Sequence, residues 1–206
     1  MLGAPDPEVV TVHPWTDVAD LLKQEAEQDL DDGVPVSPCL AAGLDEDIAL
    51  MAFLRPFPKG EYVNPMIELL ALAGALGADR LALSISGRAW SLEDPVPPVV
   101  DGVGDLRQRV VVIHTVSATA GGTEATSTLH PFNVHDGVVV WGTPVTNTSG
   151  EGWLLESLRV CVEQRAALRT NPAKAVQQLE RCRALGHLVA LTPDTARRLA
   201  SAGVAG

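Results

Sequence analysis

The sequence predicts an α+β fold, in which an antiparallel meander of about four to five strands is packed by a central helix and flanked by N- and C-terminal helices. Three observations support this fold class. Apolar residues recur at helical spacing near both ends of the chain, the period of the pattern changes to two from residue 81 onward, and the predicted helices and strands occur in separate runs. Alternating helices and strands would instead indicate an α/β fold with a parallel sheet.

Two helices are predicted ahead of the meander. The first spans residues 17–30, where Thr16 is a candidate N-cap and the carboxylates of the first turn suit the helix dipole. The second begins at Asn64–Pro65, because asparagine is a good N-cap and proline fits the first helical position. It is apolar on most sides and Gly77 is a natural C-cap, so we expect it to be the central helix of the core.

The strands are predicted from runs of apolar and β-branched residues. The continuous apolar run Ile48–Leu54 is typical of a buried strand, and further strands are expected at residues 81–90, 109–117, 126–134 and 138–141. Gly33–Gly43 is rich in proline and glycine, which indicates a linker or a packed loop. Residues 91–106 form a long loop rich in proline, glycine and acids, and loops of this length are often functional.

Helices end the chain. One is predicted over residues 153–168, a second begins at Asn171–Pro172, and a small third follows the short apolar piece at residues 187–191. These assignments divide the chain into an acidic N-terminal arm and helix, an α+β core domain and a C-terminal helical extension packed on the core, at residues 1–43, 44–170 and 171–206 respectively.

The negative charge is concentrated in the first quarter of the chain. The net charge is −11, and the first 50 residues hold twelve acids and one base, so the remaining acids and bases cancel. An acidic segment attracts basic surfaces and repels nucleic acid. The sequence therefore predicts either a solvated face or a docking region for a protein partner with a basic surface, and the candidate partner-binding residues are Asp20, Glu27, Asp31, Trp90, Glu93 and Asp94.

Composition excludes several function classes. There is no basic patch with interleaved aromatic residues, so nucleic-acid binding is not expected. The longest uncharged apolar run in a periodic segment, Leu69–Ala78, is far shorter than the ~20 residues that cross a bilayer. A secretory signal requires a positively charged start, but no lysine or arginine precedes Lys23, so we expect a cytoplasmic protein without membrane association. Arginine outnumbers lysine twelve to three, a usage typical of high-GC bacterial genomes.

Known cofactor motifs are missing from the sequence. Cys39, Cys161 and Cys182 are too scattered for a disulfide framework or a metal knuckle, and we expect them to be reduced core residues. No Walker lysine, HExxH motif or thioredoxin CxxC is present. We therefore predict no cofactor.

Histidines in the meander are the best candidates for catalysis or metal binding. A three-residue loop at Gly121–Gly122 would place His114 and His130 side by side on neighbouring strands. A two-residue loop would place His130 opposite Ile113, and the two imidazoles would point to opposite faces. His135 and Asp136 lie at the next turn and could supply a further ligand or a base, the set that a divalent metal needs to activate water. The alternative is a hydrogen-bonded core histidine at position 114 and ordinary turn chemistry at 135–137.

Arginines flank the long acidic loop. Salt bridges from Arg88, Arg107 and Arg109 to Glu93, Asp94, Asp101 or Asp105 are one interpretation, and an anion site is the other.

Three functions follow from these patterns. The favoured one is a binding or interaction protein without catalysis, which docks through its acidic N-terminal region. The alternative is a metal-dependent hydrolase that uses His114, His130, His135 and Asp136, and a third is a small-anion binder at Arg88 and Arg107.

Overall fold

The computed structural model describes residues 12–58, 60–90, 95, 97, 99–100, 104–148, 152–165 and 171–203. A short 3-10 turn, η1 (Trp15–Asp17), precedes the first helix. The helices are α1 (Val18–Asp31), α2 (Val63–Leu76), α3 (Trp153–Glu163), α5 (Pro172–Ala184) and α6 (Pro193–Gly203).

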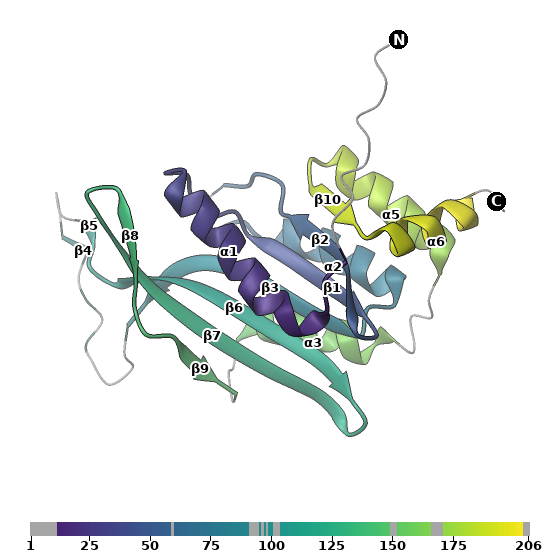
Figure 1. Ribbon diagram of the computed structural model, residues 1–206, viewed down its shortest axis with the longest axis horizontal. Coiled ribbons are helices and arrows are strands. Elements are labelled where there is room, and N and C mark those ends of the chain that lie inside the picture. The colour runs from purple at the N-terminus through teal and green to yellow at the C-terminus, as the bar shows by residue number, and fades with distance from the viewer. Residues whose placement is uncertain are drawn as a thin grey trace, which may run out of the picture.

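One large antiparallel sheet organises the fold (Figure 1). Its strands are β1 (Cys39–Leu44), β2 (Asp47–Phe53), β3 (Arg80–Ala89), β6 (Gln108–Thr119), β7 (Gly122–His135), β8 (Val138–Trp141), β9 (Val145–Asn147) and β10 (Leu188–Leu191). They lie in the order β10-β2-β1-β3-β6-β7-β8, with β9 beside β7, and β4 (Val99–Val100) pairs with β5 (Gly104–Asp105) in a separate ribbon. The α+β class is confirmed, whereas the expected four to five strands understate an eight-stranded sheet.

The helix α1 covers one face of this sheet, as Figure 1 shows. Its buried stripe packs against side chains that β1, β3 and β6 direct to that face, among them Ala41, Ala82 and Ile113. Trp15 anchors the start of the helix, because its ring lies against Gly43 of β1 and its backbone N–H donates to the carbonyl of Glu46 at 2.7 Å. The predicted helix over 17–30 is confirmed, but Thr16 does not cap it.

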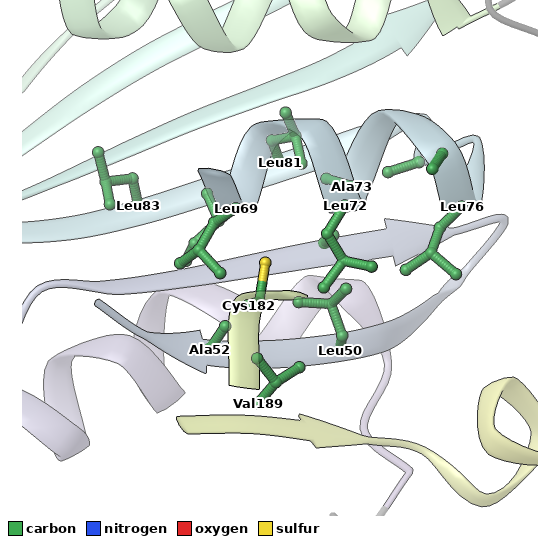
Figure 2. Packing of buried hydrophobic residues seen from close by; sticks show 14 of the residues in the cluster. Leu50, Ala52, Leu69, Leu72, Ala73, Leu76, Leu81, Leu83, Cys182 and Val189 are labelled. Carbon is green, nitrogen blue, oxygen red and sulfur yellow. The ribbon is translucent and has the colours of Figure 1, made fainter. Parts of the chain in front are cut away.

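The opposite face carries the larger core. The helix α2 lies there between the sheet and the C-terminal elements, and Figure 2 shows Leu69, Leu72 and Leu76 directed toward Leu50 of β2. Cys182 of α5 and Val189 of β10 complete the same cluster. Gly77 ends α2 in the left-handed conformation (φ 77°) that glycine adopts without strain, as predicted. The helix begins at Val63, so Asn64 is not its N-cap.

Strand β1 is the main correction to the predicted elements. Gly33–Gly43 was expected to be a linker or loop, but its last residues belong to a strand at the centre of the sheet, between β2 and β3. Both faces of this strand are buried, with Leu40 and Ala42 toward α2 and Cys39 and Ala41 toward α1. A strand buried on both faces shows no alternation of apolar and polar residues, which hides it from a periodicity analysis.

The C-terminal segment also contributes a strand. β10 pairs antiparallel with β2, from Leu188 opposite Phe53 to Leu191 opposite Leu50. The residues predicted to form a helical extension on the core, 171–206, therefore include the edge strand of the main sheet. None of the helices among the described residues is long and apolar enough to span a membrane.

Candidate functional site

The two candidate histidines lie on opposite faces of the sheet. Thr119 pairs with Gly122, so a two-residue loop of Ala120 and Gly121 joins β6 to β7. In this register His114 lies opposite Ser127 and His130 lies opposite Val111. Successive side chains of a strand point to opposite faces, so the residues at 114 and 111 face opposite ways. His114 and His130 therefore point to opposite faces, as expected for a two-residue loop. The residue opposite His130 is Val111, however, and not Ile113 as predicted.

Each histidine has a local partner on its own face. The Nδ1 atom of His114 lies 2.7 Å from the Oγ atom of Ser127, and burial lowers the pKa of this imidazole. On the α1 face, the imidazole of His130 meets the ring of Trp141 edge-on, with 6.4 Å between the ring centres. Burial, and secondly the charge of Lys23, lowers the pKa of His130. Both imidazoles are therefore biased toward the neutral form within the sheet.

The remaining candidates of the hydrolase interpretation lie at the β7–β8 turn. His135 and Asp136 are exposed there, and Asp136 adopts a positive φ of 51°. Within the described residues, no group of three or more histidines, cysteines or acids is placed to hold a metal ion. A metal site that uses both His114 and His130 is not formed by this arrangement.

The acidic residues proposed for partner binding differ in their surroundings. Asp20 and Asp31 are exposed on α1, whereas Glu27 forms an ion pair with Lys23 one turn away. The Lys23 ammonium also lies 4.7 Å from the centre of the Trp141 ring. Trp90 is 37% exposed, and Glu93 and Asp94 lie outside the described residues. Docking through α1 therefore stays a prediction that depends on Asp20 and Asp31.

Another buried histidine, His187, takes part in a polar network with Glu68 and Arg55. His187, whose side chain is fully buried, has its Nε2 atom 2.7 Å from the Oε2 atom of Glu68 on α2. Its Nδ1 atom accepts a hydrogen bond from the backbone N–H of Arg55, so the ring proton is on Nε2 and is donated to Glu68. Both ring nitrogens are thus occupied, and neither is left to take a proton from a substrate. We assign this histidine a structural role.

Glu68 receives a second, charged partner in the same network. The guanidinium of Arg55 donates from Nε and Nη2 to the two carboxylate oxygens at 2.9 and 3.1 Å. These hydrogen bonds, with a smaller contribution from His187, hold the pKa of Glu68 below its ordinary value of 4.5. The network joins the end of β2, helix α2 and the turn before β10.

Glu68→Gln is expected to lower the free energy of unfolding by about 1–2 kcal/mol at pH 7, because the amide cannot accept the charged bidentate contact. A carboxyl whose pKa is depressed in the folded state stabilises above its unfolded pKa and loses that contribution as pH falls through the folded value. The difference between variant and wild type should therefore shrink as the pH falls below 4.5. Urea unfolding between pH 3 and 7 measures this difference, and Glu156→Gln, at an exposed position, is the control. A stability difference that does not change with pH would contradict the ionised contact of Glu68 with Arg55.

An open cleft beside the end of α1 gathers arginines from neighbouring strands. Its volume is about 510 Å³, and its lining residues are Leu30, Pro35, Val36, Ser86, Gly87, Arg88, Asp105, Arg107, Arg109 and Phe132. The sheet register builds one wall, because Arg88 of β3 lies opposite Arg109 of β6, which in turn lies opposite Phe132 of β7. The same alternation that directs Val111 toward α1 directs these three side chains into the cleft.

Two of the arginines are held in place by neighbouring groups. Arg107 makes a bidentate ion pair with Asp105, with distances of 2.9 Å from Nε to Oδ1 and 2.6 Å from Nη2 to Oδ2. This contact lowers the pKa of Asp105 to about 2, so the group stays ionised. The Nη1 atom of Arg88 donates to the carbonyl oxygens of Asp105 and Arg107 at 3.2 and 2.8 Å. These carbonyls fix the Arg88 guanidinium without neutralising its charge.

Arg109 is the third arginine, and its guanidinium carbon lies 4.8 Å from the centre of the Phe132 ring. Across the parts of the chain that the structure describes, no carboxylate forms an ion pair with Arg88 or Arg109. The lining residues carry a formal charge of +2 in a protein whose net charge is −11. Of the salt bridges expected from the sequence, the structure shows the one from Arg107 to Asp105, while the other expected acids, Glu93, Asp94 and Asp101, lie outside the described residues.

Arg88 and Arg107 were predicted as a possible anion site, whereas Phe132 and the apolar residues Leu30 and Val36 were not. The cross-strand register of β3, β6 and β7 is the signal that groups them, and it depends on loop lengths that the sequence left open. The chain matches no protein-family model, no curated protein and no solved structure.

Proposed function

We propose that this protein is a binding protein without a catalytic centre of its own, and that the arginine cleft binds an oxyanion, a carboxylate or a phosphate, on its ligand. The observation that supports this proposal is the cross-strand pair of Arg88 and Arg109. Like charges directly opposite each other on adjacent strands destabilise a sheet. An anion bound between the two guanidiniums would convert this repulsion into attraction.

The chemistry of the lining suits such a ligand. The planar guanidinium presents N–H donors in a fork that matches both carboxylate and phosphate. The carbonyl contacts of Arg88 and the cation–π contact of Arg109 with Phe132 orient both groups before any ligand arrives, which reduces the entropy lost on binding. The hydroxyl of Ser86, on the same face of β3, adds a further donor to the cleft.

Arg109→Ala is expected to weaken the binding of inorganic phosphate by at least about tenfold, because a charge-assisted hydrogen bond contributes about 1.5–3 kcal/mol. Isothermal titration calorimetry at low ionic strength measures this change. Arg159→Ala is the matched control, since Arg159 lies on α3 and pairs with Glu156 outside the cleft. Equal phosphate affinity in wild type and Arg109→Ala, or no phosphate binding by the wild type, would overturn the proposal.

The chain's own acids provide a second test. Glu93, Asp94 and Asp101 lie in the sequence between Trp90 and the cleft residue Asp105. A variant with all three replaced by their amides should bind phosphate with nearly wild-type affinity if the cleft serves an external ligand. Phosphate binding that appears only in this triple variant would show that these carboxylates neutralise the cleft, and the proposed function would be wrong.

A further inference from the structure

The cleft is much larger than the oxyanion that its arginines would hold. Its volume of about 510 Å³ falls within the range of small-molecule sites, about 300–1,000 Å³. An inorganic anion between Arg88 and Arg109 would therefore leave most of the space to solvent. The size of the cleft indicates a ligand whose anionic group carries an organic body.

Part of the cleft lining is apolar. Leu30 at the end of α1 and Val36 in the following segment line the cleft together with the arginines, and so does Pro35, which is exposed. These residues offer no charged group and only backbone polar atoms to the ligand body. An apolar body fits this part of the lining better than a polar one, because burying polar groups without partners costs free energy.

Arg109 adds a preference for a flat body. The guanidinium carbon of Arg109 lies over the Phe132 ring, 4.8 Å from the ring centre, so Phe132 covers one side of this group. Arg109 also lines the cleft, so the side of its side chain that Phe132 does not cover is available to a ligand there. Arginine stacks on aromatic planes with both cation–π and dispersion attraction. A planar ring bound there would complete a three-layer stack with the guanidinium in the middle.

We infer, on the basis of the proposed function, that the ligand of this cleft is an aromatic oxyanion, in which a phosphate or carboxylate binds between Arg88 and Arg109 while an attached planar ring stacks on Arg109 beside Leu30 and Val36. Phosphate and carboxylate share the anion chemistry that the guanidiniums recognise, and the ring supplies the remaining contacts.

The test compares three phosphates by calorimetry at one pH and ionic strength. Phenyl phosphate carries a planar apolar ring, glycerol 1-phosphate carries a polar flexible body, and inorganic phosphate carries no body. Phenyl phosphate is expected to bind about tenfold more tightly than either of the others, as stacking on a guanidinium predicts. Benzoate against acetate repeats the comparison for the carboxylate.

A conservative variant separates stacking from charge. Arg109→Lys keeps the positive charge but removes the planar face, so the ratio of the phenyl phosphate affinity to the inorganic phosphate affinity is expected to fall to near one. The ratio should stay at about ten in Arg159→Ala. If the wild type binds all three phosphates equally, the ligand class is wrong while the proposed function stands. If it binds none of them, the proposed function fails as well.

Discussion

Gly43→Val is expected to destabilise the protein by about 3 kcal/mol, because side chains forced into a packed site shift their neighbours. A Cβ atom at this position would lie 2.6 Å from Cε3 and 3.0 Å from Cζ3 of Trp15, and 3.3 Å from Cβ of Arg80. The Trp15 ring is rigid and buried against β1, so it cannot shift without disturbing its neighbours. Urea unfolding followed by tryptophan fluorescence measures the change.

Gly87→Ala is the control for this prediction. It lies in β3, and a Cβ atom there would meet nothing within 4 Å. The free energy of unfolding of the Gly87→Ala variant should stay within about 0.5 kcal/mol of that of the wild type. Replacing Trp15 by leucine in the Gly43→Val background should restore part of the loss, because residues in contact are not additive. A full loss in the double variant would show that the clash with Trp15 is not its cause.

His187→Ala is expected to destabilise the protein by about 3 kcal/mol. The substitution opens a cavity at a fully buried site, leaves the Arg55 backbone N–H without its acceptor and removes one of the two donors to Oε2 of Glu68. Thermal unfolding monitored by circular dichroism reports the loss as a lower melting temperature. The same substitution at the exposed His135 should have almost no effect, and equal losses at both positions would contradict the structural role of His187.

The elements that sequence predicts well are those with one buried face. In α1, Val18, Leu22 and Ala26 recur at helical spacing, and the helix is found within one residue of its predicted bounds. β1 has no such face, since α1 and α2 pack on its two sides and require the small residues Ala41 and Ala42 that weaken its strand signal.

Local capping signals are decisive only when the surrounding chain agrees with them. Asn171 caps α5 as predicted, with its Oδ1 atom accepting from the backbone N–H of Lys174 at 3.0 Å. Asn64 carries the same Asn–Pro signal but lies inside α2, which starts earlier at Val63 and has no side-chain cap. The helix there is held by the burial of Met66 and Leu69 rather than by its first turn.

The candidate site depended on the register, which the sequence left open. A change of one residue in a strand pairing moves every side chain to the other face. The loop of Ala120 and Gly121 fixes the pairing of β6 with β7, and this pairing separates His114 from His130 while it places Arg109 beside Phe132. The charge of the arginines was visible in the sequence, but their grouping on one face was not.

The pairing of β10 with β2 has a consequence for the order of assembly during translation. Residues 188–191 hydrogen-bond to residues 50–53, so the ribosome must release nearly the whole described chain before this edge of the sheet is closed. Until then β2 presents an unpaired strand edge, the kind of surface on which nascent chains aggregate. Synthesis of this protein therefore includes a vulnerable interval that ends only when its last strand emerges.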